Sequence, residues 1–288
     1  MTRVYLFCSM MLLLLSTPLH AQRMTNTYND NDADDNGDPY EHRTYFMTGM
    51  EYLSNNVYLG RKDSIAIPYY SPYIGYHWAS GLYCKGMVSY TTAKNGRIDL
   101  ATLEGGYDHN FGDNFTAGFS ADKFFYNKNS TSIRSATKGG AGIYGQYNND
   151  YIEPQLSFDV NVNSHSTDYV LAFNLDHDFG MAHNTVHVIP MAGVALGTQH
   201  YYDEYFIARL NKLAKKDKVK SVVENPDQLV PLVYELSTQG TYRVGKWLIG
   251  LQPTYAIPLS PATVTINKKT YQEKLSNSFY VAINVCLR

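Results

Sequence analysis

The sequence predicts an all-β protein, a single up-and-down antiparallel transmembrane β-barrel of about 12 strands. Tyr accounts for 26 of the 288 residues and charged residues for only 17%, a composition typical of strands. Apolar and polar residues alternate over long segments, whereas strands of soluble proteins usually have about 5–6 residues. A tilted strand that crosses a bilayer needs about 9–11 residues, so these lengths favour a membrane barrel.

Residues 1–21 are predicted to be a secretory signal peptide. Arg3 supplies the positive start, residues 4–15 are almost entirely apolar, and Pro18 ends the apolar run. We expect export through the Sec pathway, with cleavage near Ala21. The alternative, an uncleaved membrane anchor, would be short for a span of about 20 residues.

Residues 22–43 are polar and acidic, and we expect a flexible periplasmic arm. The pattern Asp32-x-Asp34-x-Asn36-Gly37 matches the first half of a calcium-binding loop. Arg43 stands where such a loop requires a bidentate Glu, which favours a solvated tail over a calcium site.

The barrel is predicted to span residues 44–288. The clearest alternation covers residues 152–163. There the apolar side chains at even positions point to one face of the strand, and the polar side chains at odd positions point to the other. The predicted strands are 44–54, 68–79, 82–92, 97–109, 114–126, 139–148, 151–163, 168–178, 185–198, 231–243, 246–258 and 277–287.

The connections between these strands alternate in length. Short turns contain Gly, Asn or Asp, as in Ser80-Gly81 and Val244-Gly245. The longer loops are 55–67, 93–96, 127–138, 164–167, 199–230 and 259–276. An even number of strands with short periplasmic turns and longer extracellular loops is typical of outer-membrane barrels.

Because the apolar face of each strand is assigned to lipid, the polar face is predicted to line the lumen. The predicted lumen-lining residues are Lys85, Glu104, Asp108, Asp122, Glu153, Asp159, Asp176, Glu235 and Arg243, and Glu51 is also expected to point inward. Acidic residues outnumber basic ones here, which would favour cations. Twelve strands lie between the filled eight-stranded barrel and the open 16–18-stranded pore, so we expect a narrow, partly blocked lumen.

Trp78 and Trp247 fall on the apolar face at short-turn ends, and they are predicted to form part of an aromatic belt at the membrane interface. Cys84 is expected to face lipid and Cys286 the interior, on strands that are not neighbours, so no disulfide is predicted. His177, His183 and His187 cluster around one hairpin, but rim histidines are commoner than zinc sites and no metal site is predicted.

Residues 203–224 interrupt the β pattern. Phe206, Leu210 and Leu213 recur at helical spacing beside several lysines, so a helical insertion in an extracellular loop is predicted at about 203–224. Either a basic amphipathic helix contacts lipopolysaccharide phosphates or caps the pore, or the segment is a solvated helical loop.

The order of parts resembles that of outer-membrane β-barrel proteins of Gram-negative bacteria, in particular barrels with no assigned activity. The specific stretches are residues 54–63 (SNNVYLGRKD) and Gly106-Tyr107-Asp108. The resemblance implies insertion by the barrel-assembly machinery and contact with outer-membrane lipid and lipopolysaccharide. Residues 279–287 alternate as the last strand of such barrels does, but Arg288 stands where an aromatic residue is usual.

A net charge of −2 argues against a nucleic-acid partner. The sequence has no nucleophile elbow, zinc-protease motif or phosphate loop, so neither an enzyme activity nor a cofactor is predicted. The leading hypothesis is a non-catalytic outer-membrane barrel that acts as a small-solute channel or as a structural or binding element. The alternatives are a membrane-embedded lipid hydrolase and a soluble secreted β domain. The oligomeric state, the solute and the role of loop 199–230 stay open.

Overall fold

The computed structural model describes residues 9–13, 24–28, 44–63, 65–93, 96–112, 114–182, 185–213, 221–266 and 269–288. The calcium-like pattern at residues 32–37 and His183 therefore lie outside the described residues. Within residues 1–43, the strands β1 (Ser9–Leu13) and β2 (Met24–Tyr28) pair with each other.

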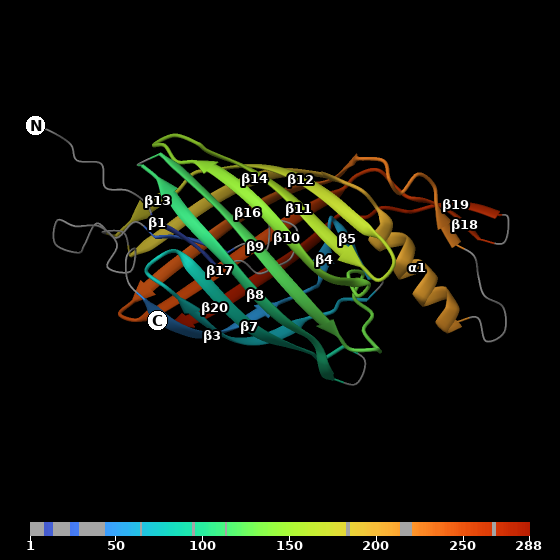
Figure 1. Ribbon diagram of the computed structural model, residues 1–288, viewed down its shortest axis with the longest axis horizontal. Helices are drawn as coiled ribbons and strands as arrows, with labels where there is room; N and C mark the ends of the chain where they lie inside the picture. The colour runs from blue at the N-terminus through green and yellow to red at the C-terminus, as the bar shows by residue number, and fades with distance from the viewer. Residues whose placement is uncertain are drawn as a thin grey trace, which may run out of the picture.

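Twelve long strands form one closed antiparallel barrel (Figure 1). They are β3 (Tyr45–Leu53), β6 (Tyr69–His77), β7 (Leu82–Thr91), β8 (Arg97–Phe111), β9 (Phe115–Tyr126), β10 (Thr137–Tyr147), β11 (Glu153–Asn163), β12 (Thr167–Asp176), β14 (Val186–Gly197), β16 (Val230–Val244), β17 (Trp247–Pro258) and β20 (Ser278–Leu287). Neighbours in sequence pair throughout, β20 pairs with β3, and β12 pairs with β14 across the short strand β13 (Phe179–Met181). The predicted fold class is confirmed, with each predicted strand end within two residues of the observed one.

The closure has a simple physical reason. Every strand carries polar side chains on one face and apolar ones on the other, so an open sheet would leave one face mismatched with its surroundings in a bilayer. Closing the sheet also removes the edges that would otherwise carry unpaired backbone groups. At the short-turn end the hairpins are tight: Val244 pairs with Trp247 around Gly245, whose φ of 57° suits glycine.

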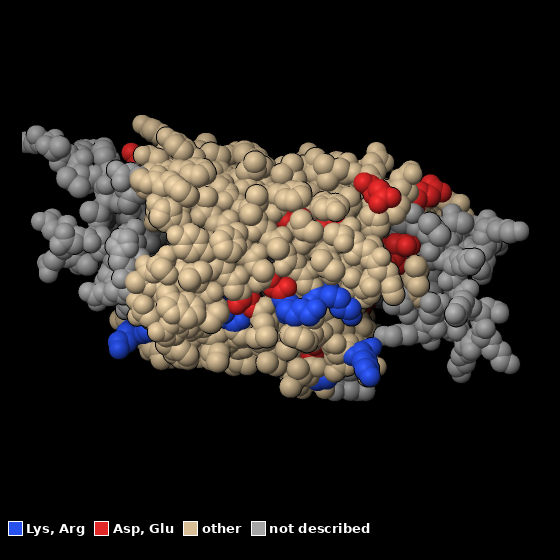
Figure 2. All heavy atoms as spheres, in the orientation of Figure 1, with Lys and Arg blue, Asp and Glu red and all other residues tan. Residues whose placement is uncertain are grey.

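The outer wall is apolar and has aromatic residues at both ends. Exposed aromatic side chains near the short turns are Phe46, Tyr76, Trp78, Phe111, Phe115, Tyr147, Phe179 and Trp247. Those near the loop end are Tyr70, Tyr90, Phe125, Tyr169, Tyr234, Tyr255 and Phe279. Most of the wall in Figure 2 carries no charge. The exposed lysines Lys123 and Lys138 lie near the loop-side ends of β9 and β10.

The longer loops build a cap at one end of the barrel (Figure 1). It contains the hairpin of β4 (Val57–Tyr58) and β5 (Arg61–Lys62), the helix α1 (His200–Leu213), and a three-stranded sheet of β15 (Ser221–Val223), β18 (Thr263–Ile266) and β19 (Lys269–Gln272). No helix among the described residues is long and apolar enough to cross a membrane.

The helical insertion predicted at 203–224 differs from the observed helix at both ends. The helix begins earlier, at His200, because the Asp168 carboxylate accepts hydrogen bonds from the amides of His200 and Tyr201. Residues 221–223 are instead a strand, β15, which pairs antiparallel with β18. Residues 214–220 and the side chains of Phe206, Leu210 and Leu213 lie outside the described part of the chain.

Candidate functional site: the interior of the barrel

Burial alternates residue by residue along the strands. On β6, Tyr69, Ser71, Tyr73, Gly75 and His77 are buried, whereas the residues between them are exposed. The same alternation on neighbouring strands gives the barrel a polar interior and an apolar exterior. This distribution of polar and apolar residues is the inverse of that in a soluble protein, and it suits a barrel surrounded by lipid.

The structure places the predicted interior residues at different depths. Lys85, Glu104, Glu153, Asp176 and Glu235 are buried, and so is Glu51. Asp108, Asp122, Asp159 and Arg243 are half-buried. On the outer wall, Trp78 and Trp247 are 41% and 49% exposed near the short turns.

One group of these residues lies in register across three strands. Lys85 of β7 is opposite Glu104 of β8, which is opposite Asp122 of β9. The Tyr83 hydroxyl donates to Glu104 Oε1 at 3.3 Å, and Lys85 Nζ lies 4.7 Å from the centre of the Tyr73 ring. The Tyr73 ring therefore offers the buried Lys85 ammonium a cation–π contact, and Glu104 is its cross-strand neighbour.

A second group lies nearer the short turns. Glu153 of β11 is directly opposite Asp176 of β12, and Gln146 Nε2 donates to Glu153 Oε2 at 2.7 Å. The His187 ring contacts both oxygens of Asp178, at 2.9 and 3.0 Å. The group therefore combines carboxylates and amide side chains on adjacent strands, an arrangement suited to hydrated cations or polar solutes.

The carboxylates of Asp108 and Asp159 each lie against a glycine of the neighbouring strand, and this contact accounts for their partial burial. A Cβ at Gly118 would lie 2.3 Å from Asp108 Oδ1, and the Tyr144 hydroxyl donates to the same oxygen at 2.7 Å. A Cβ at Gly142 would lie 2.1 Å from Asp159 Oδ1. Glycine at these positions is what allows the close approach.

Sequence reasoning missed Arg134, because it lies in the predicted loop 127–138 rather than on a strand. Its side chain is nevertheless buried inside the barrel, where Nη2 donates to Asn161 Oδ1 at 3.3 Å. The guanidinium lies 4.0 Å from the centre of the Phe124 ring and 5.2 Å from that of Tyr58. No periodic pattern signals such a residue, since its position depends on a loop folding inward.

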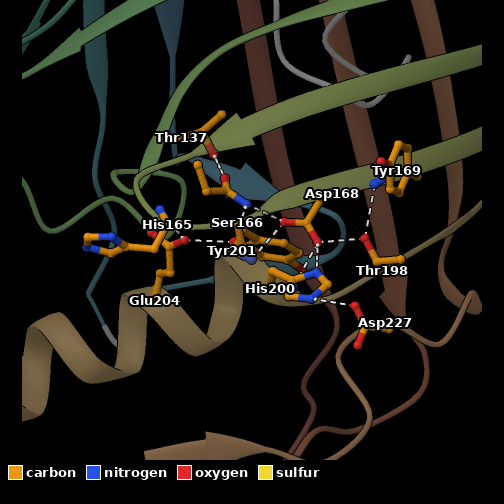
Figure 3. A network of polar contacts seen from close by, with 11 residues as sticks. Thr137, His165, Ser166, Asp168, Tyr169, Thr198, His200, Tyr201, Glu204 and Asp227 are labelled. Atoms are coloured by element: carbon orange, nitrogen blue, oxygen red, sulfur yellow. Dashed lines mark hydrogen bonds and ion pairs between the residues drawn. The ribbon is translucent and has the colours of Figure 1, made fainter.

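A hydrogen-bond network fixes the start of α1 to the barrel rim (Figure 3). The fully buried Asp168 of β12 accepts from the amides of His200 and Tyr201, at 2.8 and 2.7 Å. It also accepts from the Thr198 hydroxyl at 2.6 Å. Glu204 of α1 accepts from the backbone amides of Ser164 and His165 and from the Ser166 hydroxyl. The helix is thus attached to the loop at residues 164–166 and to the start of β12, rather than solvated on all sides.

A second network joins the β4–β5 hairpin to the other loops through Arg61. The guanidinium contacts Glu273 at 3.2 Å through Nε, and the side chain is 2% exposed. Burial opposes its charge, but Tyr201 and Glu273 outweigh burial and raise the pKa of Arg61. Burial raises the pKa of Tyr201 to about 12, although Arg61 acts in the opposite direction.

The remaining candidate groups are structurally separate. Cys84 is exposed on the outer face and Cys286 is buried, and both are free thiols. His177 is half-buried and His187 pairs with Asp178. Among the described residues, no group of three or more His, Cys, Asp or Glu is arranged to hold a metal ion.

Comparison with known proteins gives matches in structure only. No protein-family model and no curated protein matches the sequence. The chain is similar to the NanC porin, with a TM-score of 0.48 and 10% identity over 85% of this chain and 100% of that one. It is similar to the KdgM porin, with a TM-score of 0.44 and 10% identity over 84% of this chain and 98% of that one.

The translocator domain of the autotransporter NalP from Neisseria meningitidis gives a TM-score of 0.43 and 11% identity, over 88% of this chain and 90% of that one. The barrel fold that the resemblance to outer-membrane β-barrel proteins implied is confirmed by the closed twelve-stranded sheet itself. At these identities the likeness concerns the fold alone, so function has to be argued from the interior of this barrel.

Proposed function

We propose that this protein is a narrow outer-membrane channel for small polar solutes, with a preference for cations. The observation that supports it is the inversion of the barrel, with an apolar wall outside and a polar face inside whose charged residues are mostly acidic. Of the nine predicted lumen residues, seven are acidic and two are basic. Carboxylates along a narrow passage lower the energy of a cation there and raise that of an anion.

The basic residue Arg134 reduces the excess of negative charge near Asp122 and Asn161. The preference for cations is therefore expected to depend mainly on the carboxylates near the short turns. There Glu153 and Asp176 face each other across adjacent strands. Neutralising both side chains removes two carboxylates without changing their shape.

Planar-bilayer recording tests the proposal. In a potassium chloride gradient, the purified protein is expected to show openings whose reversal potential has the sign of a cation-selective pore. The double variant Glu153→Gln/Asp176→Asn should shift the reversal potential toward zero. The matched control is Asp227→Asn, since Asp227 is 91% exposed at the loop end and should leave selectivity unchanged. An anion-selective or unselective wild type would contradict the cation preference.

A structural or binding barrel is the second candidate, and the loop cap favours it because the cap covers one end of the interior. It predicts silence in the wild type and in every variant with a loosened cap. The proposed absence of catalysis is tested separately with phospholipid substrates in mixed micelles, where release of fatty acid by the refolded barrel would support the lipid-hydrolase alternative.

We also propose that lipopolysaccharide phosphates contact Lys123 and Lys138 on the outer wall. Both side chains are exposed near the loop-side ends of lipid-facing strands, where a lysine reaches the headgroup level and finds anionic partners. The variant Lys123→Ala/Lys138→Ala should retain less lipopolysaccharide on purification than the wild type, and equal retention would contradict the contact.

A further inference from the structure

The β4–β5 hairpin lies inside the mouth of the barrel rather than above it. Its turn consists of Leu59 and Gly60, both with positive φ, of 50° and 75°. Tyr58 and Leu59 are 1% and 0% exposed. Apolar side chains at the tip of a connecting loop are normally solvated, so complete burial means that the tip is enclosed by other parts of the protein.

The barrel wall is shaped to receive this tip. Each of the strands β12, β14, β16, β17 and β20 contributes at least one small, apolar, inward residue toward its loop end. These residues are Val170, Ala172, Ala195, Val233, Ala256 and Ala282, and they form one buried cluster with Val57, Tyr58 and Leu59. A Cβ at Gly60 would lie 2.9 Å from Val233 Cγ2 and 3.0 Å from Pro258 Cα, so the turn is in close contact with the wall.

A water-filled mouth would not be lined in this way. On β12, for example, Asn174 and Asp176 follow Ala172 on the same face, so the lining changes from apolar to polar within one strand. The apolar section is therefore matched to a permanent apolar occupant, and the hairpin is that occupant.

Arg61 joins the hairpin to two other loop segments. Its Nε contacts both oxygens of Glu273, Nη1 donates to the Tyr201 hydroxyl at 3.3 Å, and Nη2 donates to Ser260 O at 2.9 Å and Gln199 Oε1 at 3.2 Å. The guanidinium also lies 4.9 Å from the centre of the Tyr202 ring.

Glu273, the partner of Arg61, also accepts hydrogen bonds from other residues. It accepts from the Tyr202 hydroxyl at 2.5 Å and from the Ala262 amide at 3.0 Å, in addition to Arg61. Its side chain is 12% exposed. Removal of either charge would leave the other buried without its partner, which favours movement of the loops away from each other.

We propose that the β4–β5 hairpin is a plug that closes the loop-side mouth, and that the Arg61–Glu273 ion pair is the latch that holds it there. Release of the latch exposes the polar interior to the outer side. The idea that the plug gates a current rests on the proposed channel function. The idea that the plug keeps solutes out of the loop-side mouth does not depend on that function.

The first measurement reports closure without requiring a current. A reporter thiol is introduced as Gln252→Cys, an inward, fully buried position of β17 that lies farther from the loop end than Ala256, in a Cys84→Ala/Cys286→Ala background. A membrane-impermeant maleimide is added to intact cells. The latch variants Arg61→Ala and Glu273→Gln are expected to label at least about tenfold faster than the intact latch, since loss of one partner favours opening by more than about 1.4 kcal/mol.

The control is Lys62→Ala, the next residue of the same hairpin, whose Nζ donates only an exposed hydrogen bond to Asn277 O at 3.0 Å. It should label like the intact latch. Glu273→Gln keeps the side-chain shape, so it remains informative if Arg61→Ala does not fold; folding is checked by the heat-dependent mobility of the barrel on gels. Equal labelling of intact and latch variants would overturn the plug.

The second measurement is single-channel recording of the same variants. Open probability is expected to rise at least about tenfold in both latch variants and to stay unchanged in Lys62→Ala. Faster labelling without current in any variant would retain the plug and refute the channel. Full current and fast labelling in the wild type would refute the plug and retain the channel.

Discussion

Asp168 is the residue whose removal should most clearly separate the cap from the barrel. Its carboxylate is fully buried and accepts the first two amides of α1, the Thr198 hydroxyl and the Asn163 side-chain amide, at 2.6 to 2.8 Å. The substitution Asp168→Ala leaves all these donors without their acceptor. We expect α1 to open locally while the barrel stays folded.

The magnitude follows from the two amide contacts. A hydrogen bond to a charged group contributes about 1.5–3 kcal/mol, so loss of two such bonds costs about 3–6 kcal/mol before relaxation. Water can enter at the barrel rim and replace part of the loss, which brings the expected change to about 3 kcal/mol. Since every 1.4 kcal/mol is tenfold, local opening should become about 150-fold more frequent.

Hydrogen exchange of α1, measured by mass spectrometry on protein in lipid nanodiscs, checks this expectation. The matched control is Asp227→Ala, which removes the other partner of His200. That contact, 3.0 Å from His200 Nε2, involves a side chain that is 91% exposed. Exposed ion pairs contribute at most about 1 kcal/mol, so exchange should rise less than about fivefold. Equal exchange in Asp168→Ala and Asp227→Ala would refute the capping role.

Two further predictions concern the wall of the barrel. Ile143→Arg places a charge on a 61% exposed position near the middle of β10, and it should lower the free energy of unfolding in lipid by about 2–4 kcal/mol in denaturant titration; an unchanged value would contradict the lipid-facing assignment. Gly118→Ala should lower it by about 1–3 kcal/mol because the new Cβ collides with Asp108 and Tyr144, whereas Gly86→Ala, whose nearest contact would be 3.6 Å away, should be tolerated. Similar effects of the two alanines would argue against the close approach at Gly118.

The strands could be predicted because each carries its own signal. Alternation with a period of two requires only neighbours in sequence, and it assigns both the face and the approximate ends of an element such as β11. The inward direction of Glu104 and Glu153 follows from the same period. Their partners, by contrast, depend on register between strands, which local sequence does not specify.

The loops could be predicted only as breaks in the alternating pattern of the strands, and their structure could not be predicted. The start of α1 depends on Asp168, 32 residues earlier than His200, and β15 exists because β18 lies beside it. Arg134 reaches the interior from a loop, and Arg61 contacts Glu273, 212 residues away in the chain. Contacts between residues so far apart in the chain produce no periodic pattern in the sequence.

By itself the sequence determined the barrel: its strand count, its inverted sorting of polar and apolar residues, and the acidic character of its interior. These properties are local, because each strand must match lipid on one face and the interior on the other. Tertiary structure alone decided that residues 54–63 fold back into the mouth. A short hairpin with Tyr58, Leu59 and Arg61 could be solvated or buried, and only the small apolar residues on five distant strands provide the space that buries it.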